Sequence, residues 1–173
     1  LSAARRESGK IKDAGTRLAA LYRKELAPHV HPVAVEREIL IAHELWPIEV
    51  IGYVDVEEED NLVERKTAAR RNSSPNSEWQ WQGRIYQLAT NKRITWHQSV
   101  KNERDPAKQS ASILASQEYD GTLVARTALM VAQAMKQVEH LWTTYGPDEM
   151  WPGHGVVHPW ACSFCGYRDN CPW

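Results

Sequence analysis

Three short runs rich in β-branched residues follow one another early in the sequence and limit the folds open to the chain. They cover residues 32–42, 49–56 and 61–66, and the acidic stretch 57–60 separates the last two. Runs of this length and composition are typical of β-strands, and a short polar connection between two of them is typical of a hairpin. The chain is therefore expected to build part of a sheet here.

Two stretches on either side of these strands have apolar residues at helical spacing. The first is 13–26, with Asp13 as the expected cap and Pro28 as the stop. The second is 78–90, which follows a polar loop and begins near Ser77. Both are predicted to be amphipathic helices.

The second half of the chain continues with strands and a long helix. Residues 94–100 and 111–119 are predicted strands, separated by the charged loop 101–108. Asp120 offers a cap for a helix whose apolar residues alternate spacings of four and three, and Gly146 would end it. The order of elements predicts a mixed α/β domain whose central sheet is flanked by helices.

Length and charge set further limits. The 173 residues suit one domain, with 1–150 as its core and 151–173 as a terminal segment packed on it. The net charge of -1 gives no overall positive field, so any nucleic-acid contact must come from a local patch. No apolar run is long enough for a membrane span and no secretory signal is evident, so a cytoplasmic protein without membrane contact is expected.

The expected hairpin brings two carboxylates together. If its turn is centred between Glu59 and Asp60, facing residues have numbers that sum to 119, which sets Asp55 opposite Glu64. The same register sets Tyr53 opposite Lys66. Like charges facing each other on paired strands repel unless a cation lies between them, and Mg²⁺ prefers such oxygen ligands. The alternative is that the acidic turn is only solvated and that Glu64 and Lys66 are ordinary exposed strand residues.

Four motifs occur together in an order that resembles the RecB-like PD-(D/E)XK exonucleases. They are Gly52–Asp55, Val63–Thr67, Gln82–Tyr86 and a terminal Cys-x-x-Cys-x5-Cys. The likeness covers about residues 32–172 and is nearest to the iron–sulfur branch, which includes CRISPR-associated exonucleases, AddB-type nucleases and phage relatives. The resemblance implies a restriction-endonuclease-like core with a cysteine-ligated cluster in its C-terminal tail.

The resemblance also implies roles for individual residues. Asp55 and Glu64 would hold Mg²⁺ or Mn²⁺, and Lys66 would be the catalytic lysine. Gln82 and Tyr86 match the family's Gln-x-x-x-Tyr element, which lies beside the active site and contacts the DNA backbone. The alternative for these two is that they merely flank an apolar helical stripe.

Two further expectations concern the shell around that metal. Glu36 matches an acidic position often seen on the preceding strand and is expected to be a metal ligand. Relatives often carry a metal-binding histidine on the first helix, but residues 13–26 contain none, and His29 and His31 lie just after it.

The cysteines Cys162, Cys165 and Cys171 form a tight terminal cluster. Spacing of this kind favours metal or cluster ligation over disulfides. In the resembling family three such ligands join a fourth upstream cysteine around a 4Fe-4S cluster, but this sequence has no upstream cysteine. Zinc completed by His154 or His158, or no bound metal, are the alternatives.

A local basic surface is expected from residues on both sides of the polar loop and around the second helix. They are Lys66, Arg70, Arg71, Arg84, Lys92 and Arg93. Such residues would bind the DNA backbone without reading sequence. Trp79 and Trp81 could stack on single-stranded bases or could belong to the core.

These observations predict a metal-dependent DNA nuclease, most simply an exonuclease acting on single- or double-stranded ends. The first alternative is an inactive or truncated DNA-binding or assembly module of the same fold, in a recombination, phage or CRISPR complex. The second is a metal-stapled interaction domain with no nucleic-acid role.

Overall fold

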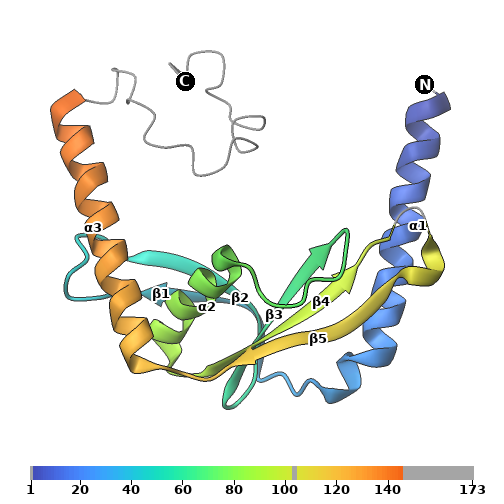
Figure 1. Cartoon of the computed structure of the whole chain (residues 1–173), viewed down its shortest axis with the longest axis horizontal. Coiled ribbons are helices and arrows are strands. Elements are labelled where there is room, and N and C mark those ends of the chain that lie inside the picture. The colour runs from blue at the N-terminus through green and yellow to red at the C-terminus, as the bar shows by residue number, and fades with distance from the viewer. Residues whose placement is uncertain (1, 103–104, 146–173) are drawn as a thin grey trace.

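Five strands form one mixed sheet in the order β1-β2-β3-β4-β5 (Figure 1). The computed structural model describes residues 2–102 and 105–145 of the chain. The strands are β1 (Ala34–Ile41), β2 (Val50–Glu57), β3 (Asn61–Ala68), β4 (Arg93–Val100) and β5 (Ser110–Gln117). The helices are α1 (Ser2–Glu25), α2 (Ser77–Thr90) and α3 (Gly121–Tyr145), with short 3-10 turns η1 (Ala27–His29) and η2 (Pro106–Lys108).

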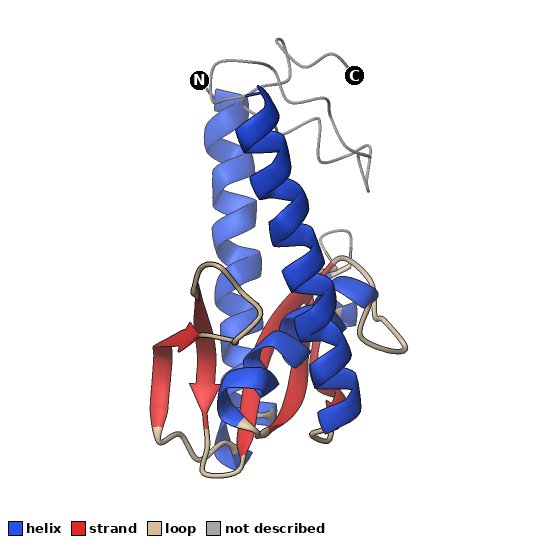
Figure 2. Cartoon of the chain, turned by 90° about the vertical axis from the view of Figure 1, so that its left-hand side faces the viewer, coloured by secondary structure: helices blue, strands red, loops and turns tan. Residues whose placement is uncertain are grey.

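Only β3 and β4 run parallel, and every other neighbouring pair of strands is antiparallel. A parallel pair needs a crossover connection, which α2 provides. The β1–β2 and β4–β5 ladders are long, whereas β2 and β3 share only two paired positions. The β1–β2 hairpin consequently stands apart from the other strands (Figure 2).

Helix α2 lies over the middle of the sheet. α1 and α3 lie at opposite ends of the sheet and both project upward from it in this view, with α2 between them (Figure 1). α1 packs on β5, while α3 packs on α2. The helices therefore flank the sheet, as the order of elements predicted.

The core lies between the sheet and the α2–α3 pair. Its most buried apolar side chains include Ile41, Leu62, Ile94 and Trp96. Trp46, from the β1–β2 connection, donates its indole N–H to the backbone oxygen of Ala128 at 2.9 Å. This bond satisfies the polar atom of a buried tryptophan and attaches α3 to the hairpin.

The sequence located most elements to within two or three residues, and the clearest error is the start of α1. The helix begins at Ser2 rather than Asp13, so Asp13 lies inside it and is no cap. Residues 2–12 lack apolar periodicity but are rich in Ala, Arg, Lys and Glu, which favour helix intrinsically. The expected Asp120 cap is confirmed, because its Oδ1 accepts the N–H groups of Thr122 and Leu123 at 2.9 and 3.1 Å.

None of the helices in residues 2–102 and 105–145 combines the length and hydrophobicity needed to cross a membrane. The three cysteines, with His154 and His158, lie outside the described residues, as does the expected segment 151–173.

Gly83 on α2 is predicted to be required for helix–sheet packing. A Cβ there would lie 2.7 Å from Cζ2 of Trp96, so Gly83→Ala should destabilise the fold by about 1–3 kcal/mol despite alanine's higher helix propensity. Gly15→Ala on α1 is the matched control, since a Cβ there meets nothing within 4 Å and should stabilise by about 0.5–1 kcal/mol. Chemical denaturation measures both, and a stabilising Gly83→Ala would contradict the packing argument.

Candidate active site

The β2–β3 hairpin opens at the two carboxylates. Val56 pairs with Val63 and Glu57 with Leu62, so the expected register, in which facing numbers sum to 119, is confirmed. The ladder then stops, and the expected pairing of Tyr53 with Lys66 is wrong because the strands diverge before reaching it. Asp55 and Glu64 are thus the first residues beyond the paired part of the hairpin.

Beyond the last backbone pair, carboxylate side chains connect β2 and β3. The Arg65 N–H donates to Asp55 Oδ2 at 2.6 Å, and the Asp55 N–H donates to Glu64 Oε1 at 3.4 Å. Each carboxylate therefore bridges to the opposite strand. The two acids are brought together, although their strands no longer pair.

Lys66 joins the carboxylates to helix α2. Its Nζ donates to Glu64 Oε2 at 3.0 Å and to Gln82 Oε1 at 2.6 Å. The side chain is 18% exposed and that of Glu64 only 2%. Lys66 thus lies beside the buried carboxylate of Glu64 and is held by both Glu64 and Gln82.

Gln82 and Tyr86 extend the same network to β2. Gln82 Nε2 donates to Tyr86 Oη at 3.0 Å, and Tyr86 Oη donates to the backbone oxygen of Tyr53 at 2.8 Å. The Tyr86 ring fits because the neighbouring strand position is Gly52, where a Cβ would lie 2.7 Å from Tyr86 Cε1. The ring belongs to the core while its hydroxyl belongs to the site, so these residues do more than flank an apolar stripe.

Burial dominates the electrostatics of the site. It raises the pKa of Glu64 above its ordinary value; the positive charge of Lys66 opposes this rise and the nearby charge of Asp55 adds to it. Burial also raises the pKa of Tyr86, and the charges of Glu64 and Asp55 add to the effect. Lys66 thus offsets only part of the cost of ionising the buried Glu64, and an added cation next to this carboxylate would offset more of it.

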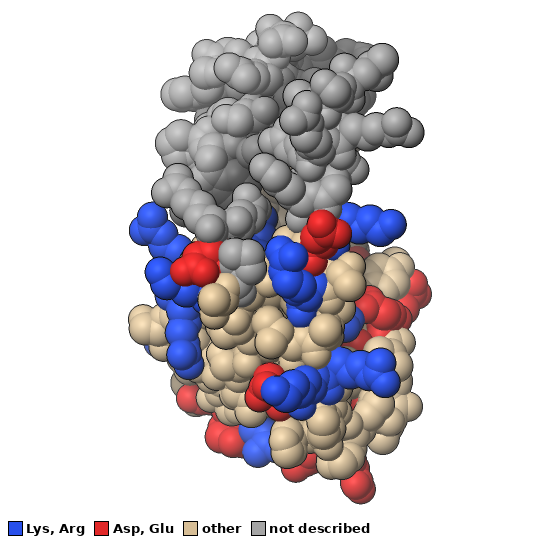
Figure 3. All heavy atoms as spheres, turned by 90° about the vertical axis from the view of Figure 1, so that its right-hand side faces the viewer, with Lys and Arg blue, Asp and Glu red and all other residues tan. Residues whose placement is uncertain are grey.

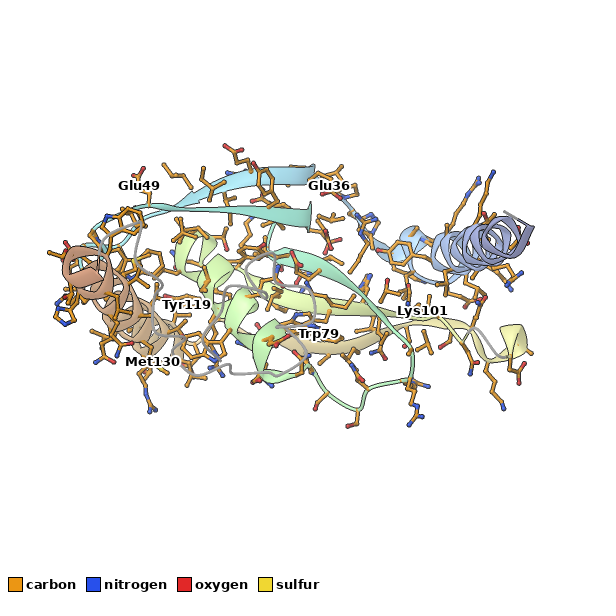
Figure 4. All side chains as sticks on the ribbon, turned by 90° about the horizontal axis from the view of Figure 1, so that it is seen from above. Glu36, Glu49, Trp79, Lys101, Tyr119 and Met130 are labelled. Atoms are coloured by element: carbon orange, nitrogen blue, oxygen red, sulfur yellow. The ribbon has the colours of Figure 1, made fainter. Side chains whose placement is uncertain are left out.

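Glu36 is connected to the carboxylate pair through Arg65. Its Oε1 lies 2.9 Å from Arg65 Nη2, while Arg65 Nε lies 3.9 Å from Asp55 Oδ2. The backbone of Glu36 has a φ of 48°, and the β1–β2 ladder skips Glu36 and Asp55. Figure 4 shows Glu36 at the end of the hairpin nearer α1. Glu36 therefore binds an arginine here, and its role as a metal ligand remains a prediction.

Tyr22 of α1 contacts His97 of β4 beside this site, a placement that sequence reasoning missed. Its Oη lies 3.1 Å from Nδ1 of His97, the β4 residue in register with Arg65. Burial lowers the pKa of His97, and it raises the pKa of Tyr22, on which the charges of Arg65 and Asp55 also act. Tyr22 and His97 are far apart in sequence, and no local pattern links them.

Asp55 and Glu64 suit an ion such as Mg²⁺, which keeps several water ligands, better than an ion that is enclosed entirely by protein ligands. Among the residues that the structure describes, no group of three or more His, Cys, Asp and Glu side chains is placed to hold a metal. Mg²⁺ commonly takes one or two carboxylates and completes its shell with water and substrate phosphate. The Asp55 side chain is 25% exposed, which leaves it accessible from solvent. The two acids therefore fit such an ion.

Two of the residues expected in a basic surface have acidic neighbours. Lys92 Nζ lies 2.8 Å from Glu57 Oε1 and 2.7 Å from the backbone oxygen of Glu58. Arg93 lies within 4 Å of Asp60 and Glu118. The positive charge of Lys92 is therefore offset by a buried carboxylate, and that of Arg93 only in part by exposed ones; their place in a basic surface stays a prediction.

Trp79 and Trp81 of α2 are candidates either for base stacking or for the core. Trp79 packs against the core cluster, which favours the packing interpretation for that residue. Trp81 is partly buried on the same helix.

The mixed sheet thus carries two neighbouring carboxylates and a lysine where the β2–β3 ladder ends. The PD-(D/E)XK nuclease superfamily matches residues 3–172 of the sequence, and the chain belongs to this superfamily. The solved crystal structure of SSO0001 has a similar fold, with a TM-score of 0.51, 15% sequence identity and coverage of 95% of this chain and 68% of that one. The comparison with curated proteins gave no match.

Two buried glutamates are predicted to affect stability in opposite directions. The raised pKa of Glu64 means that ionising this carboxyl destabilises the folded protein. The free energy of unfolding therefore falls as pH rises through that pKa. Glu64→Gln should therefore raise the Tm at about pH 8 in EDTA, and the gain should shrink at about pH 4, where the native carboxyl is protonated.

Glu57 is the matched control. Burial alone would raise the pKa of Glu57, but hydrogen bonds from Lys92 and Arg37 outweigh it and hold the pKa below its ordinary value. Its stabilisation is present at neutral pH and is lost as pH falls, so Glu57→Gln should lower the Tm at about pH 8. Thermal unfolding measures both variants, and a lower Tm for Glu64→Gln would contradict the interpretation of the site.

Proposed function

We propose that this chain is a divalent-metal-dependent DNA exonuclease whose centre is Asp55, Glu64 and Lys66. The observation that carries the proposal is the convergence of these three side chains where the β2–β3 ladder ends. Membership of a nuclease superfamily supports the hydrolysis of phosphodiesters. The attack at DNA ends, rather than within the strand, belongs to the proposal.

Asp55 and Glu64 would hold the metal, as their charge and geometry allow. Bound Mg²⁺ or Mn²⁺ would supply Lewis acidity and an activated water at the phosphate. The carboxylates fix where that chemistry occurs, because each is tied to the opposite strand of the hairpin. Glu36, linked through Arg65, is proposed as a further acidic residue of this shell.

Lys66 would orient the attacking water and offset negative charge that develops on the phosphate. Its ammonium carries three protons, and bonds to Glu64 and Gln82 fix its direction while leaving one proton for substrate. Gln82 is in turn held by Tyr86. Preorganised donors of this kind lower the barrier because little reorganisation is needed during reaction.

Finer features of the proposal come from the resemblance. Cys162, Cys165 and Cys171 would ligate a structural iron–sulfur cluster, with zinc as the alternative. A DNA-binding or assembly module without catalysis is the second candidate function, favoured by the exposed arginines near the site.

Lys66→Ala is predicted to abolish most cleavage. In a fluorescent DNA degradation assay with Mg²⁺ or Mn²⁺, kcat should fall by about 100-fold or more, the usual cost of a preorganised donor. Asp55→Asn should behave similarly, and EDTA should stop the wild type. Lys136→Ala is the control, because Lys136 is an exposed lysine of α3. Binding of DNA without cleavage by the wild type would instead select the non-catalytic module.

DNA ends are predicted to be required. A covalently closed circle should resist degradation, whereas the same circle cut once should be degraded, because an exonuclease starts at a terminus. Gel electrophoresis over a time course distinguishes the two substrates. Equal loss of both would replace the exonuclease by an endonuclease while keeping the metal-dependent centre.

A further inference from the structure

We infer that the end of the sheet where β3 and β4 finish is the track for the DNA backbone beyond the scissile phosphate. Four exposed side chains form this surface, called here the basic end: Arg17, Arg70, Arg71 and Lys101. The inference rests on the proposed function, since it assigns the surface that holds that substrate.

The parallel pairing of β3 and β4 brings three of these residues together. Parallel strands finish at the same edge of a sheet. Ala68 pairs with Val100, and the Lys101 N–H donates to the backbone oxygen of Ala68 at 2.8 Å. Lys101 therefore lies beside the start of the loop that carries Arg70 and Arg71.

Helix α1 adds Arg17 to the same end. Val100 also pairs with Ser110, so Gln109 precedes β5 at this edge. Arg17 Nε donates to Gln109 Oε1 at 3.3 Å, which attaches the guanidinium beside the strand ends. Figure 4 shows Lys101 toward α1 and Tyr119 toward α3, in agreement with this polarity.

The loop carrying Arg70 and Arg71 is held at both ends. The Asn72 N–H donates to Oε1 of the fully buried Gln98 at 3.0 Å. At its far end, Asn76 caps α2 by accepting the Trp79 N–H at 2.8 Å. Anchoring of this kind lowers the entropy lost when the arginines bind a ligand.

The other end of β3 and β4 has the opposite character. There Lys92 and Arg93 are paired with Glu57, Asp60 and Glu118. The charges of Lys92 and Arg93 are therefore offset by carboxylates, whereas Arg70 and Arg71 are exposed on their loop. Figure 3 faces the α1 side of the molecule, where Lys and Arg side chains cross the middle of the described surface with some Asp and Glu side chains beside them.

The position of the basic end suits a phosphate backbone. A strand rises about 3.3 Å per residue, so Arg70 lies at most about 13 Å along the chain from Lys66. Phosphates on one strand of B-DNA are about 3.4 Å apart along the axis, so Arg70 lies within roughly four nucleotides of Lys66. An exposed arginine within that range, such as Arg70, fits phosphates that follow the one being cut.

Removing two of these charges tests the inference. Arg70→Ala combined with Arg71→Ala should weaken binding of a fluorescent DNA duplex in EDTA by about tenfold, and reduce the slope of log Kd against log salt by about two. Fluorescence polarisation between about 50 and 200 mM KCl measures both quantities without cleavage. Arg126→Ala combined with Lys136→Ala removes the same charge from exposed positions of α3 and should leave both unchanged.

The outcomes separate this inference from the proposed function. A wild-type Kd and salt slope in the Arg70 and Arg71 double variant, or an equal loss in the α3 control, would overturn the basic end. Salt-sensitive binding that depends on Arg70 and Arg71 without cleavage in Mg²⁺ would support the basic end as a surface for the DNA backbone and reject the nuclease. Cleavage with an unaltered KM in the double variant would keep the nuclease and reject the track.

Discussion

The buried carboxylate of Glu64, held next to Asp55, is the interaction on which the rest of this structure depends. Two acids this close, one of them almost fully desolvated, are unfavourable without a cation, and Lys66 offsets only part of the cost. The fold keeps them together by ending the β2–β3 ladder after two pairs and by using backbone N–H groups as partners. The protein thus accepts lower stability at the site proposed to hold a metal.

Helix α2 makes that arrangement rigid. Lys66 would otherwise be a flexible side chain, but Gln82 fixes its ammonium and Tyr86 fixes Gln82. The tyrosine can reach the backbone of β2 only because Gly52 leaves room for its ring. One network therefore connects β2, β3 and α2, and packing of the helix on the sheet is inseparable from the geometry of the site.

Membership of the PD-(D/E)XK nuclease superfamily connects this geometry with the proposed cleavage of phosphodiesters. The distribution of charge around the sheet supports the proposed surface for the DNA backbone. The two ends of the parallel strands differ because their cations have different neighbours. Lys92 has carboxylate and carbonyl partners, whereas Arg70 and Arg71 are exposed on a loop anchored by Gln98. A nearly neutral chain can in this way present a local surface suited to phosphates.

The sequence by itself determined the strands, the helices apart from the start of α1, and the register of the two paired positions of the β2–β3 hairpin, because propensity, capping and turn length act between neighbours. It also brought Glu64 and Lys66 to one side of β3 through the two-residue repeat of a strand. Only the tertiary structure decided three side-chain pairs, which are Arg65 with Glu36, Tyr22 with His97 and Arg17 with Gln109. Each of these contacts joins residues far apart in the chain, and such contacts depend on how elements pack rather than on any local pattern.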